Sequence, residues 1–118
     1  MTQEGKALAA FKVLTAAELA ELEEGSFAGS ADDQRDGFIH LSTATQLTAT
    51  VDKHFAGRDD LWVAEVDLAA LGDKVRWEPS RGGEDFPHLY AALPLATVVA
   101  YSPLERDEGG AVRLPVTG

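Results

Sequence analysis

The sequence predicts a single α+β domain, with a mainly antiparallel, split sheet of about five or six strands and two short helices in the N-terminal half. Three observations predict this class. The 118 residues give room for one compact domain, strand-like apolar segments recur along the whole chain, and both helical patterns lie before residue 56. A doubly wound parallel sheet would need strands and helices to alternate to the end, and no convincing long helix follows Asp67.

The domain is expected to span residues 8–118, after a flexible tail of residues 1–7 that shows no apolar pattern. The first strand is predicted over residues 8–14, where apolar side chains flank Lys12. A lysine inside an apolar strand indicates one solvated side, so Lys12 is expected to be exposed.

A short helix is predicted directly after this strand. Thr15 and Glu18 have the spacing of a capping box, in which hydroxyl and carboxylate each accept a hydrogen bond from the other residue's amide, and Gly25 marks the helix end. Residues 25–37 are rich in glycine, serine and aspartate, so we predict a loop that wraps around Phe27.

A strand over residues 38–42 is the next predicted element. The alternation of side chains along a strand places His40 and Ser42 on the same face. Either Ser42 or Thr43 can cap a second helix, which apolar residues at helical spacing predict over residues 43–55.

Strands dominate the second half of the chain. The β-prone segments are residues 61–67, 75–78, 96–101 and 111–114. A single helical turn is predicted at residues 68–72, and the last two strands are expected to form a hairpin. Residues 79–90 contain prolines, glycines and charges, and this composition predicts a loop.

Composition and charge narrow the classes of partner. The 20 acidic and 10 basic residues give a net charge of −10, which disfavours long nucleic acids because these bind through their phosphates. The absence of cysteine excludes disulfides and thiolate nucleophiles, and the three histidines have no zinc-binding spacing, so no metal site is predicted. The N-terminal region resembles neither a secretory signal nor a membrane-spanning helix, so we expect a cytoplasmic protein without a membrane partner.

A small-anion site is predicted in the glycine-rich segment after the strand at 75–78. Paired glycines allow backbone amides to point into one concave nest, and a guanidinium can bind a phosphate or carboxylate through two hydrogen bonds. The residues of this segment are Ser80, Arg81, Gly82 and Gly83. The alternative is a plain turn in which Arg81 pairs with a neighbouring acidic residue, Glu78, Glu84 or Asp85.

Two histidines are candidate catalytic residues. His88 lies between proline and aromatic neighbours, and an imidazole held in such surroundings can donate a hydrogen bond or act as an acid or base near neutral pH. His40 shares a strand face with Ser42, a candidate ligand-binding residue. For each histidine the alternative is a structural hydrogen bond within the protein. His54 lies on the apolar stripe of a predicted helix and is left out of the site.

Four ordered motifs resemble a single protein family. They are residues 36–43, 54–57, 76–83 and 86–90. Together they resemble the bacterial domain of unknown function 952 family, over about residues 9–104. This resemblance implies a compact, divergent form of the ADP-ribosyltransferase fold, in which a split antiparallel sheet cradles NAD in related enzymes.

The same resemblance implies a nucleotide-like ligand. The segment His40-Leu41-Ser42 is similar to the strand that contacts ribose and nicotinamide in those enzymes, although Leu41 stands where they have glycine and their catalytic glutamate has no convincing match. The branch that includes RNA 2′-phosphotransferases uses histidine and arginines, and Arg76, Arg81 and His88 are comparable residues here.

Three hypotheses for the function remain open. The first is an enzyme, related to ADP-ribosyltransferases or phosphotransferases, that acts on a small anion or nucleotide, with NAD or an ADP-ribose-like molecule as candidate ligand. The second is a non-catalytic small-molecule binding module, and the third is a structural role only. We expect His40 and His88 to face one cleft, with Arg81 at its rim. The predicted ligand-binding residues are Ser42, Arg76, Ser80, Arg81, Gly82, Gly83 and Tyr90.

Overall fold

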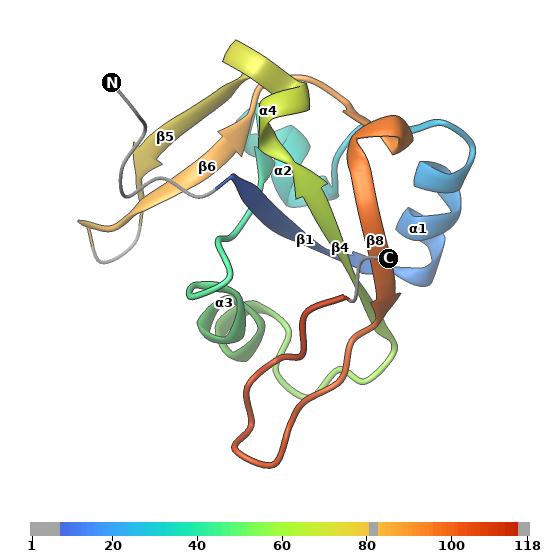
Figure 1. Cartoon of the computed structure of the whole chain (residues 1–118), viewed down its shortest axis with the longest axis vertical. Coiled ribbons are helices and arrows are strands. Elements are labelled where there is room, and N and C mark those ends of the chain that lie inside the picture. Colours follow the sequence, from blue (N-terminus) through green and yellow to red (C-terminus); the bar gives the residue numbers. More distant parts are fainter. Residues whose placement is uncertain (1–7, 81–82, 116–118) are drawn as a thin grey trace.

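The computed structural model describes residues 8–80 and 83–115 of the chain (Figure 1). The strands are β1 (Ala9–Thr15), β2 (Ser26–Phe27), β3 (Ile39–His40), β4 (Leu61–Asp67), β5 (Val75–Pro79), β6 (Asp85–Leu89), β7 (Leu93–Pro94) and β8 (Val98–Pro103). The α-helices are α1 (Ala16–Glu23), α2 (Ala31–Asp36), α3 (Leu47–His54) and α4 (Leu68–Leu71), and short 3-10 turns precede β5 and β8. The predicted tail, residues 1–7, lies outside the described residues.

All strand pairings between the named elements are antiparallel, which confirms the predicted α+β class. Two three-stranded sheets have the orders β1-β4-β8 and β3-β6-β5, and β2 pairs with β7. The larger sheets meet where Phe11 of β1 bridges Ser42, just after β3, through backbone hydrogen bonds of 2.7 and 3.0 Å. The sheet is therefore split, and the candidate site lies at this junction.

The N-terminal strand and helix form where they are predicted. The hydroxyl of Thr15 accepts from the amide of Glu18 at 3.1 Å, and the Glu18 carboxylate accepts from the Thr15 amide at 3.0 Å. These two hydrogen bonds complete the predicted capping box. The expected exposure of Lys12 is wrong: its residue surface is only 7% exposed, because both faces of β1 are covered.

Side chains from the two faces of the β1-β4 pair enter separate apolar clusters. Ala10 and Leu14 pack with residues of α1 and α4, whereas Phe11 and Val13 pack with residues of α3. The period of two along a strand explains this division. Among residues 8–80 and 83–115, no helix has both the length and the apolar character needed to cross a bilayer.

The predicted loop at residues 25–37 is wrong in part, because it contains helix α2. Ser30 and Asp33 form a second capping box, with hydrogen bonds of 2.9 and 3.1 Å. Gly37 ends the helix with a φ of 89°, a left-handed conformation that favours glycine. Phe27 is fully buried on β2, as expected of the residue at the centre of this segment.

Helix α3 begins later than the sequence predicts, at Leu47 rather than residue 43. Thr43 forms a turn before the helix, in which its hydroxyl accepts from the Gln46 amide at 3.3 Å. The Ser42 hydroxyl is not a helix cap either. It lies 2.9 Å from the hydroxyl of Thr50, one side chain of the helix itself.

The prediction of a loop over residues 79–90 is also wrong in part, because Asp85–Leu89 form the central strand of the β3-β6-β5 sheet. The composition of the segment predicted a loop, and Pro87 lacks the amide hydrogen that a residue of a central strand usually donates. Its carbonyl oxygen nevertheless accepts the Leu41 amide, so the strand continues through the proline.

The predicted C-terminal hairpin does not form as a pair of strands. Strand β8 pairs with β4 instead. Within the described residues, the segment at 111–114 contributes a single bridge, between Val112 and Arg106.

Candidate functional site

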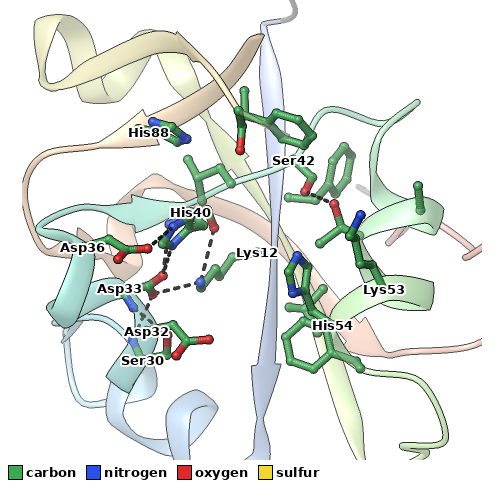
Figure 2. Close-up of a pocket in the computed structure, with 18 of the residues that line it drawn as sticks. Lys12, Ser30, Asp32, Asp33, Asp36, His40, Ser42, Lys53, His54 and His88 are labelled. Atoms are coloured by element: carbon green, nitrogen blue, oxygen red, sulfur yellow. Dashed lines mark hydrogen bonds and ion pairs between the residues drawn. The ribbon is translucent and has the colours of Figure 1, made fainter. Parts of the chain in front are cut away.

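A pocket of about 480 Å³ opens at the junction of the two larger sheets (Figure 2). Its walls come from β1, α2, β3, α3 and β6, together with the segment that precedes β6. The volume lies within the range of about 300–1,000 Å³ that is usual for small-molecule sites. The polar lining includes Lys12, Asp33, Asp36, His40, Ser42, Thr50, Lys53, His54 and His88.

Asp33 joins three elements beside this pocket. Its carboxylate lies 2.8 Å from the ammonium of Lys12 on β1 and 2.6 Å from Nδ1 of His40 on β3. It also accepts the backbone amides of Ser30 and His40, at 2.9 and 3.1 Å. Burial alone would raise the pKa of Asp33, but the hydrogen bond from His40 and the charge and hydrogen bond of Lys12 outweigh it and hold the pKa well below its ordinary value.

His40 uses both of its ring nitrogens. Nδ1 bonds to Asp33, and Nε2 lies 3.0 Å from a carboxylate oxygen of Asp36. The imidazole therefore lies between two carboxylates, one buried and one exposed, as Figure 2 shows.

His88 lies opposite His40 on the neighbouring strand. Its Nδ1 is 2.7 Å from the carboxylate of Glu78, which also accepts the hydroxyl of Tyr90 at 2.7 Å. The hydrogen bonds from His88 and then Tyr90 lower the pKa of Glu78, and the bond to Glu78 raises the pKa of Tyr90. His40 and His88 thus each have a carboxylate at Nδ1.

Phe38 fixes the relative position of the two imidazoles. Its ring stacks on His88 with centroids 4.0 Å apart and lies 4.7 Å from the ring of His40. The two imidazole centroids are themselves 5.7 Å apart, edge to face. The imidazoles of His40 and His88 are therefore packed against a third ring, Phe38, which does not itself line the pocket.

The structure brings some of the predicted site residues together and separates others. His40, Ser42, Ser80 and His88 all line the pocket. Arg76 and Tyr90 do not line it: the Arg76 guanidinium lies 4.9 Å from the centre of the Tyr90 ring. Tyr90 is linked to the pocket indirectly, because its hydroxyl donates to Glu78, which is hydrogen-bonded to the pocket residue His88.

Of the predicted anion nest, the structure describes Ser80 and Gly83. Arg81 and Gly82 lie outside the described residues. Gly83 does not line the pocket; its amide donates to the Ser80 carbonyl at 2.9 Å, and the Ser80 amide donates to the Glu84 carbonyl at 3.0 Å. The amides of Ser80 and Gly83 are thus both engaged in backbone hydrogen bonds, while the anion nest and the alternative pairing of Arg81 both stay predictions.

Sequence reasoning missed most of the charged residues of the pocket, among them Lys12, Asp33, Asp36 and Lys53. The Ser-x-x-Asp spacing was the available signal for Asp33, whereas nothing local marks Lys12 as its partner. His54, left out of the predicted site, also lines the pocket. Figure 2 shows Lys53 and His54 on the side of the pocket opposite Asp33, Asp36 and His40.

The chemistry of the site follows from these contacts. In the described part of the chain, the Lys53 ammonium forms no ion pair, whereas the charge of Lys12 is balanced by Asp33. Over residues 8–80 and 83–115, no three histidine, aspartate or glutamate side chains are arranged to hold a metal ion. The arrangement can hold a polar molecule by hydrogen bonds and can offer it an oriented imidazole.

Comparison with known proteins places the chain in a family. Residues 13–101 match the model described as "Protein of unknown function (DUF952)". The crystal structure of protein CC0527 from Caulobacter crescentus is 40% identical, has a TM-score of 0.80, and the match covers 89% of this chain and 93% of that one. The solution NMR structure of CC0527 is 39% identical with a TM-score of 0.76, and the match covers 90% of this chain and 91% of that one.

No curated protein matches the chain. The family model covers well over half of the sequence, and the matched structures share its fold throughout most of their length. The chain therefore belongs to the DUF952 family of proteins of unknown function.

Proposed function

We propose that the pocket binds a small anionic molecule of the nucleotide class. The observation that carries the proposal is the meeting of His40 and His88, each hydrogen-bonded to a carboxylate, at the wall of one pocket of about 480 Å³. Oriented imidazoles can hydrogen-bond the hydroxyl groups of a ribose, and the volume suits a molecule of mononucleotide size.

The anionic part of the ligand is assigned to the α3 side of the pocket. Lys53 is the pocket lysine whose charge no described carboxylate balances, and His54 is its neighbour on the helix. On the opposite side, α2 carries Asp32 and Asp36 with Arg35 between them, so this side offers no excess of positive charge. A phosphate group is therefore drawn toward Lys53.

The enzymatic form of this proposal is a reaction related to ADP-ribosyl or phosphoryl transfer, with His40 and His88 as the catalytic residues. It is supported by the split antiparallel sheet and by the two histidine–carboxylate pairs at one pocket. A non-catalytic binding module is the second candidate, because both nitrogens of His40 already have protein partners.

A thermal-shift screen with NAD, ADP-ribose, mononucleotides and 2′-phosphorylated sugars tests the binding. A ligand at 100 times its Kd adds about 2.7 kcal/mol to the stability of the folded state, which raises Tm by roughly 10 °C in a domain of this size. For any ligand that this screen identifies, Lys53→Ala should weaken the binding affinity about tenfold, because the substitution removes a charged hydrogen-bond donor.

Lys74→Ala is the matched control, since Lys74 is exposed and does not line the pocket. Equal losses of affinity in the two variants would place the anion elsewhere and contradict the proposed site. Any ligand that binds is then incubated with the protein, and the mixture is analysed for products. Turnover supports the enzyme, whereas unchanged ligand supports the binding module.

A further inference from the structure

The two pocket histidines differ in which ring nitrogen the protein leaves available to a ligand. This difference deepens the proposed function and rests on it, because it concerns what the same pocket recognises. Glu78, which does not line the pocket, is hydrogen-bonded to His88.

Glu78 fixes the position of the proton on the ring of His88. An ionised carboxylate can only accept hydrogen bonds. A single oxygen, Oε1 of Glu78, lies 2.7 Å from Nδ1 of His88 and 2.7 Å from the hydroxyl oxygen of Tyr90. Both of these groups must donate to it, so a neutral His88 carries its proton on Nδ1 and a lone pair on Nε2.

The Nε2 atom of His88 is available at the pocket. His88 lines the pocket, and Nε2 forms no hydrogen bond with a residue among 8–80 and 83–115. Within the same residues, every side-chain nitrogen or oxygen atom that is buried from solvent has a hydrogen-bond partner. An unpartnered Nε2 is therefore open to the pocket rather than enclosed in the core.

His40 offers no such nitrogen. Its Nδ1 and Nε2 are both occupied, at 2.6 Å by Asp33 and at 3.0 Å by Asp36. A ligand could reach Nε2 of His40 only by displacing the Asp36 carboxylate. The two histidines therefore have different roles in spite of their paired positions on β3 and β6.

The orientation of the His88 ring is also fixed. Phe38 stacks on one face of it, with an interplanar angle of 20°, and His88 is only 5% exposed. A ring held by stacking on one face and by a hydrogen bond at Nδ1 keeps Nε2 pointing in one direction. Glu78 and Phe38 thus preorganise one hydrogen-bond acceptor at the pocket.

We infer that Nε2 of His88 accepts a hydrogen bond from a hydroxyl group of the ligand, and that Glu78 is the positioning residue that holds the ring in this tautomer. A neutral acceptor suits a neutral donor, whereas an ammonium group would be drawn to the carboxylates of α2. The ligand class is a small molecule with a hydroxyl group and an anionic group, of which a ribonucleoside monophosphate is an example.

The tautomer is measured in the ligand-free protein by two-dimensional ¹H–¹⁵N NMR of the imidazole nitrogens, at about pH 8, where an ordinary imidazole is neutral. The expected spectrum has a protonated Nδ1 and an unprotonated Nε2 for His88. Tyr90→Phe should leave this pattern unchanged because Glu78 remains. Glu78→Gln should give a mixture of tautomers, since an amide can donate as well as accept, and Glu78→Asp should restore the Nδ1–H form at least in part.

Glu84→Gln is the control for loss of a negative charge at the pocket, because Glu84 lines the pocket and is not hydrogen-bonded to His88. It should leave the tautomer unchanged. A protonated Nε2 in the wild-type protein, or an unaltered Nδ1–H form in Glu78→Gln, would overturn the inference whatever the ligand proves to be.

The hydroxyl is tested by titration with AMP and with 2′,3′-dideoxy-AMP. AMP is expected to shift the ¹⁵N resonance of Nε2 and to bind about tenfold more tightly than the dideoxy analogue, which leaves the acceptor unpaired. Equal affinities, or a shift of Nε2 by both nucleotides, would overturn the hydroxyl assignment and leave the proposed function in place. Failure of both to bind, together with a negative ligand screen, would overturn the proposed function while the tautomer result still stands.

Discussion

Removal of the charge on Asp33 should destabilise the protein more than its size suggests. Asp33→Asn preserves the shape of the side chain but leaves the Lys12 ammonium without its partner. The two groups lie 2.8 Å apart, and their side chains are 2% and 8% exposed. Loss of one member of a buried ion pair costs about 3–5 kcal/mol, a large part of the total of about 5–15 kcal/mol that is usual for a domain.

Urea denaturation followed by circular dichroism measures this loss. With an m-value of about 2 kcal/mol/M, the transition midpoint should fall by about 2 M. The double variant Lys12→Met, Asp33→Asn should be more stable than Asp33→Asn alone by at least about 1 kcal/mol, because no buried charge then lacks a partner. A single-variant loss below about 1 kcal/mol, or a double variant less stable than the single one, would refute the reasoning.

Three further predictions concern stability. The pKa of Asp33 is lowered from its ordinary value of 3.8, so its ionised form contributes fully to the free energy of unfolding above about pH 5, and this contribution is lost as the pH falls toward the folded-state pKa. In urea titrations, the difference in free energy of unfolding between the wild type and Asp33→Asn should therefore become smaller below about pH 4. Thr15→Ala should cost about 1 kcal/mol in thermal unfolding because it removes the cap of α1, whereas Thr45→Ala, at an exposed position, should not. Gly37→Ala should cost about 1 kcal/mol, since alanine is strained at a φ of 89°; an unchanged urea midpoint would contradict this.

Much of the fold could be predicted because its strands and caps have local signals. The alternation in Leu61–Asp67 and the Thr15–Glu18 spacing are properties of short segments, and both elements form as predicted. Strand β6 could not be predicted in this way, since its composition is that of a loop. Its strand conformation depends on pairing with β5 on one side and β3 on the other, and β3 is far from it in the sequence.

The residues of the candidate site could likewise be predicted only where they have a local sequence signal. His40, Ser42 and His88 could be singled out as polar groups on strand-like segments, and the structure places all three at one pocket. Lys12 could not be singled out, because a lysine in a strand indicates solvent unless its partner is known. That partner, Asp33, is 21 residues away on a helix that was predicted as loop. Long-range pairing of charges is a property of the tertiary structure and leaves no local pattern.

The residues that line the pocket come from a long part of the chain, between Phe11 and His88. Binding of a ligand is therefore linked to the cooperative unfolding of the domain. A molecule that loses any of the five contributing elements has no complete binding site, so a ligand stabilises only the intact domain. Amides of β4, which contributes no residue to the walls, should exchange with deuterium mainly when the whole domain opens. A bound ligand should therefore slow their exchange as much as that of amides in β1, although no ligand atom touches β4.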